Sequence, residues 1–260
     1  MALMDIDNIS IHFGGLKAVS GFSLSLEKEE LVAIIGPNGA GKTTVFNMLT
    51  GLYKPTSGDI LIEKKSLVGK PPHLWTKHGI ARTFQNIRLF GGTTVIENLL
   101  IAQIFHERYG LYLAFMRTRR FHKEEQQMAD MAMDLLKLFH LDEKYHFLAS
   151  NLSYGEQRKL EICRAMMTQP KVLLLDEPCA GMVQSEIDEV IRLIDQIRKQ
   201  FKVSILLIEH HMSFVMSIAE RIKVLDFGET IAEGTPQQIQ SNPKVIEAYL
   251  GSGGKLAKGN

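Results

Sequence analysis

The residues with the clearest chemical meaning are the nine residues GPNGAGKTT at positions 36–44. They fit the pattern G-x-x-x-x-G-K-[ST], with its two defining glycines at Gly36 and Gly41, and they stand between an apolar run and a helix-like stretch. The glycines let the backbone curl so that successive N–H groups point into one cavity, and the helix that follows adds its positive end. This loop is therefore predicted to bind a polyphosphate. The competing interpretation is a glycine-rich turn that merely ends a strand.

Two side chains of this loop have expected partners on a bound nucleotide. Lys42 is spaced to reach the β- and γ-phosphates through a charge-assisted hydrogen bond of about 1.5–3 kcal/mol. The Thr43 hydroxyl is placed to ligate Mg²⁺. The nucleotide-binding residues predicted in the loop are Asn38, Gly39, Ala40, Gly41, Lys42, Thr43 and Thr44.

Two adjacent carboxylates, Asp176 and Glu177, follow an unbroken apolar run at 172–175. Such a run is typical of a strand covered on both faces, and ligands gather at the carboxyl ends of parallel strands. Carboxylates at that place are costly unless they serve a cation or a proton transfer. In a P-loop protein, Asp176 would hold Mg²⁺ through its waters and Glu177 would orient or deprotonate the attacking water. The alternative is a strand end capped by solvated acids.

A second apolar run, at 204–208, ends in Glu209, His210 and His211. An imidazole at that sheet edge could donate a hydrogen bond to a γ-phosphate. A metal site is disfavoured, because adjacent histidines on a strand point to opposite faces.

The segment LSYGEQ at 152–157 contains a capping box, because Ser153 is followed three residues later by Glu156. A helix is therefore predicted to begin at Tyr154 with free N–H groups at its start. Gly155 leaves room for a ligand, so the serine hydroxyl and these amides could also form a phosphate site. Taken alone, capping is the favoured interpretation.

Length and composition limit the class of protein. A chain of 260 residues buries about 70–75% of its unfolded surface, enough for one large domain or a domain with an inserted lobe. Its 30 basic and 29 acidic residues give a charge of +1, which predicts no general affinity for nucleic acid or anionic lipid. Cys163 and Cys179 are too far apart for a CxxC metal pair and favour a reduced, cytoplasmic location. Neither a signal peptide nor an apolar run of the roughly 18–20 residues that span a bilayer is expected.

Several elements must position these groups. Strand-like runs at 6–13 and 22–26 predict edge strands of a mixed sheet, and 59–62 predicts another short strand. From 98 to 165, apolar residues recur at helical spacing, which predicts a helical lobe inserted into an α/β core. Phe13 lies before the loop, where its ring could stack on an adenine, but an ordinary core phenylalanine is favoured on the sequence alone.

Together these motifs resemble those of the ATP-binding-cassette (ABC) transporter ATPases, over essentially residues 3–251. The motifs that stand in that family's order and spacing are the P-loop at 36–44, Gln85, LSYGEQ at 152–157, LLLDEP at 173–178 and His210. Within the family, the stretches at 81–90, 94–103 and 234–251 are similar to the ATPase subunit of branched-chain amino-acid importers.

The resemblance implies a fold: an α/β, P-loop NTPase (RecA-like) core with an antiparallel β edge and an inserted helical subdomain. The whole chain, 1–260, would form a single ABC-type ATPase domain. Its core would comprise 1–97 and 166–250, its helical subdomain 98–165, and its flexible tail 251–260.

The resemblance also implies site roles, with ATP and Mg²⁺ as cofactors. Phe13 would stack on the adenine, which reverses the interpretation from the sequence alone. The implied catalytic residues are Glu177, His210 and Gln85, and the implied metal-binding residues are Thr43, Gln85 and Asp176. Ser153 and Gly155 would bind the γ-phosphate held by a second chain, so that two ATP molecules are clamped between two ATPase subunits, identical or related.

The implied partners are transmembrane permease subunits, which would contact the segment at 86–90 and the helical lobe. A substrate-binding protein would take part indirectly, and no nucleic acid is implied. The chain would be cytoplasmic and peripheral on the inner face of the cell membrane. This sequence departs from the family pattern at Val183, where the family has a polar residue that spans the dimer interface. We therefore hypothesise slow or weakly coupled ATP turnover. His211 also stands where an aspartate is common.

The expected function is ATP hydrolysis that powers import of branched-chain or other hydrophobic amino acids through these permeases. One alternative is the same ATPase with another cargo, such as urea or amide uptake or lipopolysaccharide export. Another is a soluble, non-transport ABC ATPase acting in DNA repair or translation, although such proteins usually carry a long coiled-coil insertion or two cassettes in one chain, and this sequence has neither. A GTPase is disfavoured because no NKxD motif is present.

Overall fold

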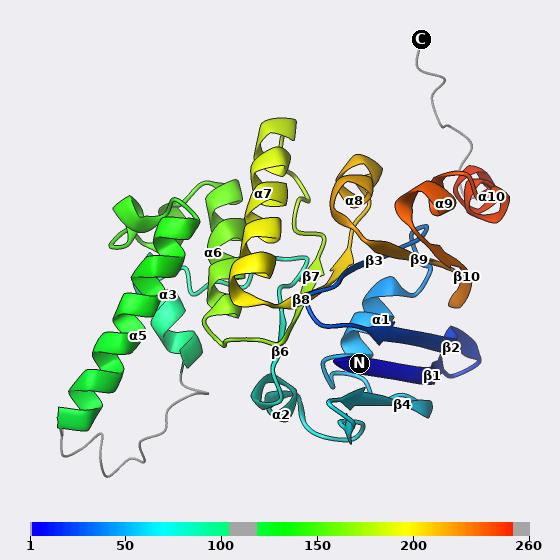
Figure 1. The fold of residues 1–260 in the computed structure, drawn as a ribbon, viewed down its shortest axis with the longest axis horizontal. Helices are drawn as coiled ribbons and strands as arrows, with labels where there is room; N and C mark the ends of the chain where they lie inside the picture. Colours follow the sequence, from blue (N-terminus) through cyan, green and yellow to red (C-terminus); the bar gives the residue numbers. More distant parts are fainter. Residues whose placement is uncertain (1, 104–118, 252–260) are drawn as a thin grey trace.

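The computed structural model describes residues 2–103 and 119–251, and its larger sheet has the strand order β10-β9-β3-β8-β7-β6 (Figure 1). Neighbouring strands in this sheet are parallel, except that β10 runs antiparallel to β9. The strands are β3 (Leu31–Ile35), β6 (Ile80–Arg82), β7 (Val172–Asp176), β8 (Ser204–Ile208), β9 (Arg221–Asp226) and β10 (Glu229–Gly234).

The register of the three central strands gathers the sequence motifs. Ile34 of β3 is paired with Ile208 of β8, and Ile208 is paired with Asp176 of β7. Because these strands are parallel, the residues that follow them meet at one edge of the sheet. The glycine-rich loop, Glu177 and the segment that begins at Glu209 therefore lie side by side.

The smaller sheet is antiparallel and has the order β2-β1-β4-β5. Its strands are β1 (Met4–Phe13), β2 (Leu16–Leu26), β4 (Ser57–Ile62) and β5 (Lys65–Ser66). The prediction that residues 6–13 and 22–26 form edge strands of a mixed sheet was wrong, since β1 and β2 belong to this separate sheet, in which every pairing is antiparallel. Alternation in these strands identifies a buried and an open face, but it does not say which strand is the partner.

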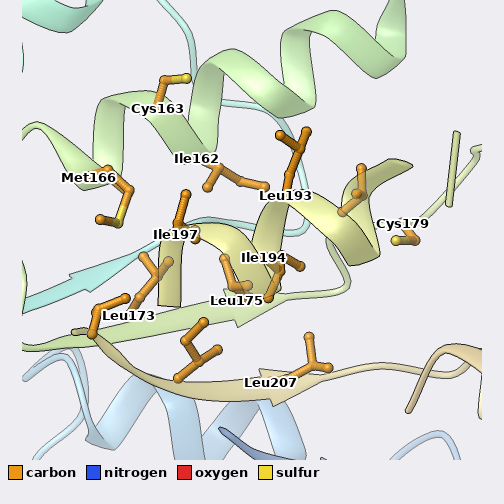
Figure 2. Close-up of a cluster of buried hydrophobic side chains, with 14 of the residues drawn as sticks. Ile162, Cys163, Met166, Leu173, Leu175, Cys179, Leu193, Ile194, Ile197 and Leu207 are labelled. Atoms are coloured by element: carbon orange, nitrogen blue, oxygen red, sulfur yellow. The ribbon is translucent and has the colours of Figure 1, made fainter. Parts of the chain in front are cut away.

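Both faces of the parallel sheet are covered, which explains its unbroken apolar strands. On one face, Val32 and Ile34 belong to a cluster shared with helix α1 (Lys42–Met48) and the smaller sheet. On the other face, residues such as Leu175 pack against α6 (Tyr154–Met166) and α7 (Gln184–Phe201) (Figure 2).

The predicted helical lobe at 98–165 is built of helices where the structure describes it. These are α3 (Val95–Ala102), α5 (Arg119–Leu138), the 3₁₀ turns η2 (Asp142–Lys144) and η3 (Ala149–Asn151), and α6. Leu99, Leu135 and Leu160 of this region lie in the same apolar cluster as Leu175 of the sheet. The boundaries of a separate helical subdomain stay a prediction.

The remaining helices are α2 (Pro72–Lys77), α8 (Met212–Ile218), α9 (Pro236–Gln240) and α10 (Pro243–Gly251). Of the predicted tail at 251–260, Gly251 is the last residue of α10, and residues 252–260 lie outside the described residues.

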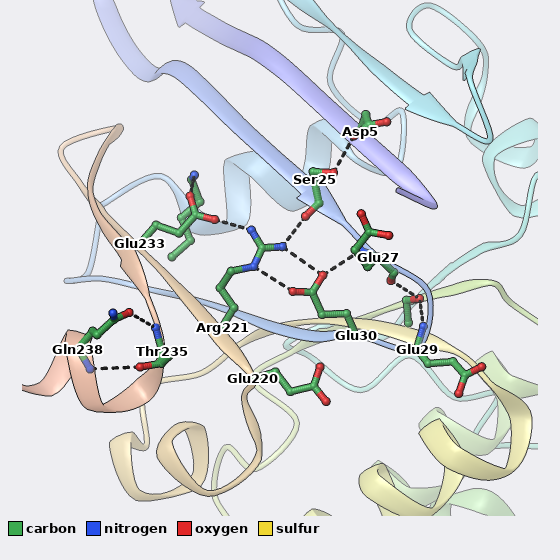
Figure 3. Close-up of polar contacts among 12 residues, drawn as sticks. Asp5, Ser25, Glu27, Glu29, Glu30, Glu220, Arg221, Glu233, Thr235 and Gln238 are labelled. Atoms are coloured by element: carbon green, nitrogen blue, oxygen red, sulfur yellow. Dashed lines mark hydrogen bonds and ion pairs between the residues drawn. The ribbon is translucent and has the colours of Figure 1, made fainter. Parts of the chain in front are cut away.

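An ion-pair network joins the two sheets near the start of β9 (Figure 3). Arg221 Nε lies 2.9 Å from Glu30 Oε1, and its guanidinium also contacts Glu233 and donates to the carbonyl of Ser25 at the end of β2. Arg221 is paired with Val32, early in β3, so this network lies away from the edge that carries the glycine-rich loop.

Candidate nucleotide-binding and hydrolysis site

The glycine-rich loop joins β3 to α1 in a conformation that only glycine allows at two positions. Gly36 has φ 153°, and a Cβ there would lie 2.0 Å from the carbonyl oxygen of Leu225. Gly41 caps α1 with φ 100°, and a Cβ there would lie 2.6 Å from the carbonyl oxygen of Ala18. Close approach of the neighbouring backbone, together with positive φ, therefore fixes both glycines of the motif.

Lys42 lies beneath this loop with its side chain turned toward the loop's own backbone. Its Nζ donates to the carbonyl of Gly36 at 2.7 Å and to that of Pro37 at 2.9 Å. Burial lowers the pKa of Lys42, while the carboxylates of Glu177 and Asp176 oppose this effect. The ammonium group is therefore held at the base of the loop, where a phosphate can replace the two carbonyls.

A cavity of about 560 Å³ opens beside the loop and brings most of the predicted site residues together. The predicted residues that line it are Phe13, Asn38, Gly39, Ala40, Gly41, Lys42, Thr43, Thr44, Gln85, Glu177 and His210. These residues come from β1, the glycine-rich loop with the start of α1, and the segments that follow β6, β7 and β8. The fold therefore brings dispersed motifs into one concave site.

Glu177 lies between two of the other predicted catalytic side chains. Its Oε1 is 2.6 Å from His210 Nε2, and its Oε2 accepts a hydrogen bond of 3.0 Å from Gln85 Nε2. Its backbone has φ 49°, an uncommon value for a residue with a side chain, and its N–H donates to the carbonyl of Ile208 at 2.8 Å. Such strained backbone clusters at functional sites, where it aims a side chain.

Asp176 is buried just behind this cavity and forms an ion pair that the sequence analysis missed. Its Oδ2 lies 2.7 Å from Nη2 of Arg82, whose Nη1 donates to Asn47 of α1 at 2.7 Å. Its Oδ1 is buried without a hydrogen-bond partner among the described residues. Burial raises the pKa of Asp176, and Arg82 opposes the shift. An arginine that ends the short apolar strand β6 was the available sequence signal.

Glu209 is a second buried carboxylate whose role the sequence did not reveal. Its side chain accepts hydrogen bonds from the backbone N–H groups of Cys179 at 3.0 Å, His210 at 2.8 Å and His211 at 3.2 Å. His211 Nδ1 also lies 3.2 Å from Glu209 Oε2, which gives this departure from the family pattern a structural partner. Glu209 therefore ties the loop after Glu177 to the segment that carries His210.

Phe13 is 45% exposed, so the interpretation as an ordinary core phenylalanine was wrong. Its ring lines the cavity and meets Tyr53 edge to face, with ring centroids 5.3 Å apart. An exposed aromatic face beside a phosphate-binding loop is suited to stacking on a base.

Ser153 and Gly155 lie at the start of α6 and do not line the cavity. The predicted capping box is confirmed: Ser153 Oγ accepts from the N–H of Glu156 at 3.4 Å, and the Glu156 carboxylate accepts from the N–H of Ser153 at 3.0 Å. Gly155 is buried, and a Cβ there would lie 2.8 Å from Glu186 Oε1, so its missing side chain makes room for α7. Their role as nucleotide ligands stays a prediction.

No group of three or more His, Cys, Asp or Glu side chains that could hold a metal ion occurs among residues 2–103 and 119–251. Within the same ranges, no helix has the length and apolar character that crossing a membrane requires.

The parallel sheet, the glycine-rich loop with its buried lysine and the carboxylate at the end of β7 together define a P-loop nucleotide-binding ATPase. Residues 19–180 match the family described as ABC transporter, and residues 229–255 match the one described as branched-chain amino acid ATP-binding cassette transporter. The chain belongs to the ABC transporter ATPase family.

Curated relatives and solved structures agree with this assignment. The high-affinity branched-chain amino acid transport ATP-binding protein LivG of Escherichia coli K12 is 48% identical over 249 residues, which cover 96% of this chain and 98% of LivG. The protein of the same description, BraF, from Pseudomonas aeruginosa is 45% identical with the same coverage. A crystal structure of the ADP conformation of an ABC transporter's ATP-binding cassette is 34% identical, with a TM-score of 0.84 and coverage of 96% of this chain and 99% of that one.

Proposed function

We propose that this chain is the ATP-hydrolysing subunit of an importer for branched-chain or other hydrophobic amino acids, working through partner permease subunits. The cargo assignment is supported by the names of LivG and BraF, which match over nearly their whole length, and by the match at 229–255. The observation that carries hydrolysis is the position of Glu177, whose carboxylate lies between Gln85 and His210 on the wall of the loop cavity.

In this proposal the triphosphate takes the place of the backbone carbonyls that now receive the Lys42 ammonium. The loop N–H groups and the start of α1 bind phosphate oxygens. Glu177 orients the attacking water and draws its proton, and His210 donates to the γ-phosphate. His210 would exchange its contact with Glu177 for that phosphate, which would free the carboxylate for water.

The donor set fits a magnesium ion, which prefers oxygen ligands and retains several waters. Asp176 offers a buried Oδ1 without a partner in the described chain, and the Thr43 hydroxyl and Gln85 lie on the cavity wall. The ion would neutralise charge on the β- and γ-phosphates during transfer.

A second cavity, of about 470 Å³, is a candidate contact for the permease. Its lining includes Arg88 and Phe90, which follow Gln85 in the chain, and Arg164 of α6. The side chain of Phe90 is 50% exposed. Basic groups around an exposed aromatic ring suit a partner segment with acidic and apolar side chains. With such permeases, the chain would act at the inner face of the membrane and serve a substrate-binding protein indirectly.

The catalytic assignment is tested by Glu177→Gln in the full chain. An amide cannot accept the proton from water, so hydrolysis should fall about a hundredfold or more while ATP binding is retained. The matched control is Glu63→Gln, because Glu63 is ion-paired with Lys171 at 2.7 Å and does not line the loop cavity. Turnover at the wild-type rate in Glu177→Gln would show that Glu177 is not the base.

The cargo assignment has a separate test. Cells that lack this chain should lose uptake of labelled leucine and regain it when the chain is restored, and permease subunits should co-purify with it. Normal leucine uptake in the deleted strain, with loss of uptake of another solute, would reject the amino-acid cargo and leave the ATPase assignment standing.

A further inference from the structure

Arg158 is a buried charge that no step of the proposed hydrolysis uses. It lies in α6 with 2% of its surface exposed. Its Nη1 donates to the carbonyl of Phe84 at 2.7 Å, and its Nη2 donates to the carbonyl of Gln85. One guanidinium therefore holds two consecutive peptides of the segment that carries Gln85, through charge-assisted hydrogen bonds that are stronger than neutral ones.

Glu161, on the next turn of α6, holds the amides of the same segment. Its Oε1 lies 3.4 Å from the backbone nitrogens of Phe84 and Arg88, and its Oε2 lies 3.3 Å from Arg158 Nη1. Glu161 is also 2% exposed, and burial raises the pKa of its carboxyl. A buried ion pair costs desolvation energy that hydrophobic residues would avoid, so fixing a specific geometry is a reason to retain it.

The same guanidinium also reaches the start of α6. Nη2 of Arg158 donates to the hydroxyl of Tyr154 at 2.9 Å. The ring of Tyr154 lies against the loop that follows Glu177, where a Cβ on Gly181 would be 3.3 Å from Tyr154 Cε1. Arg158 thus contacts the backbone of Phe84 and Gln85 directly. It also contacts Tyr154, which is next to Ser153 and packs against the loop that follows Glu177.

We propose that Arg158 is a positioning residue for ATP hydrolysis. Its side chain couples the position of the start of α6 to the position of the main chain at Gln85. A displacement of Ser153 and Tyr154 on contact with a second chain would then shift Gln85 relative to Glu177. The inference rests on the proposed function, because it presumes that Gln85 and Glu177 act in hydrolysis. Arginine suits this task because its planar fork fixes several acceptors at once, whereas a lysine ammonium is a point charge on a flexible stem.

The first test is Arg158→Lys in the full chain, which keeps the charge and loses the fork. Turnover (kcat) should fall about tenfold while the affinity for ATP changes by less than about twofold, because the P-loop contacts are untouched. Arg198→Lys is the matched control: Arg198 also donates to a backbone carbonyl, of Glu29 at 3.0 Å, and pairs with Glu220. Both variants should lose thermal stability, but only Arg158→Lys should lose turnover.

Tyr154→Phe is a milder variant, since Tyr154 is 47% exposed and only its hydroxyl is removed. It should lower turnover by a smaller factor and leave the fold intact. Unchanged turnover in both Arg158→Lys and Tyr154→Phe, or an equal loss in Arg198→Lys, would overturn the proposal.

The second test asks whether Arg158 acts through Gln85. If it does, Arg158→Lys combined with Gln85→Ala should hydrolyse ATP no more slowly than Gln85→Ala alone. Multiplication of the two losses, or full turnover in Gln85→Ala, would show that Arg158 does not act through Gln85. Glu177→Gln reports on the hydrolysis mechanism alone, so a failure of the positioning role can be told apart from a failure of the proposed function.

Discussion

Val183 is a position where one substitution should affect both the capping of α7 and the contact with a second subunit. It caps the N-terminus of α7, is 63% exposed and has no side-chain oxygen to receive a helix N–H. Glu186 Oε2 nevertheless accepts from the N–H of Val183 at 3.1 Å, so half of a capping box is already present. The same position lies in the loop after Glu177, the proposed catalytic carboxylate, where the resemblance to the ABC family implies a polar residue.

Val183→Asn should therefore change both stability and turnover. An asparagine cap stabilises a helix start by about 1 kcal/mol, which corresponds to a rise in Tm of about 2–4 °C. If a polar side chain is needed across the subunit interface, steady-state ATP hydrolysis should rise as well. Val183→Ala is the control, since it removes the valine without adding a cap. No gain in rate with Asn would contradict the hypothesis of weakened turnover.

Residue types alone predicted most of the side chains that line the loop cavity, but not the buried side chains that hold them in place. Lys42 was identified because it lies in a glycine-rich motif, and Glu177 and His210 because each follows an apolar, strand-like run. Arg82 and Glu209 depend on partners that only the fold supplies, since Asp176 is 94 positions from Arg82 and Cys179 is 30 positions from Glu209. A buried charge cannot be recognised in a sequence until its partner is known.

At the scale of elements, α7 shows how the sheet edge is supported. It buries Ile187, Val190, Leu193, Ile194 and Ile197, a stripe at helical spacing, against β7 and β8. Figure 2 shows Ile194 and Ile197 on the side of α7 near Leu173 and Leu175 of β7, whereas Leu193 points toward α6. Because Asp176 ends β7 and Glu177 follows it, the packing of this helix also supports the base of the proposed hydrolysis site.

Ile194→Ala should destabilise the fold. Ile194 is fully buried, and truncating such a side chain to alanine costs about 2–5 kcal/mol through lost burial and the cavity it leaves. Thermal denaturation should show a fall in Tm of at least about 5 °C. Ile246→Ala in α10 is the control, because Ile246 is 44% exposed, and its Tm should stay close to that of the wild type. Equal shifts in the two variants would argue against this packing.

Helices and strands were predictable from the sequence where the spacing of apolar residues within the segment is enough to identify them. Unbroken apolar runs identified β7 and β8, and helical spacing identified the helices of the 98–165 region. The antiparallel strands were found but assigned to the wrong sheet, because their pairing is a choice among distant partners. For the same reason, the register that places Ile208 between Ile34 and Asp176 could not be obtained from the sequence.

If Ser153 and Gly155 bind nucleotide, as predicted, the nucleotide site of one chain is incomplete. Every predicted nucleotide-binding residue of the P-loop lines the cavity, whereas Ser153 and Gly155 of the same chain do not. Two chains arranged head to tail would bring each Ser153 to the other chain's loop. We therefore expect ATP to act as a bridge between two subunits.

This expectation has a direct test in the Glu177→Gln background, where ATP is bound and not consumed. That variant should elute as a dimer with ATP and as a monomer without it. Adding Ser153→Arg should abolish the ATP-dependent dimer and retain ATP binding, because the new side chain blocks the partner's phosphates while the P-loop is intact.

The matched control for that variant is Thr235→Arg, because Thr235 is also the N-cap of a helix with a complete capping box. Both substitutions remove a cap worth about 1 kcal/mol and introduce the same charge, so loss of helix capping cannot explain a difference between them. Size-exclusion chromatography with light scattering distinguishes the outcomes. A dimer that persists in Ser153→Arg, or disappears equally in Thr235→Arg, would mean that the start of α6 does not face the partner's nucleotide.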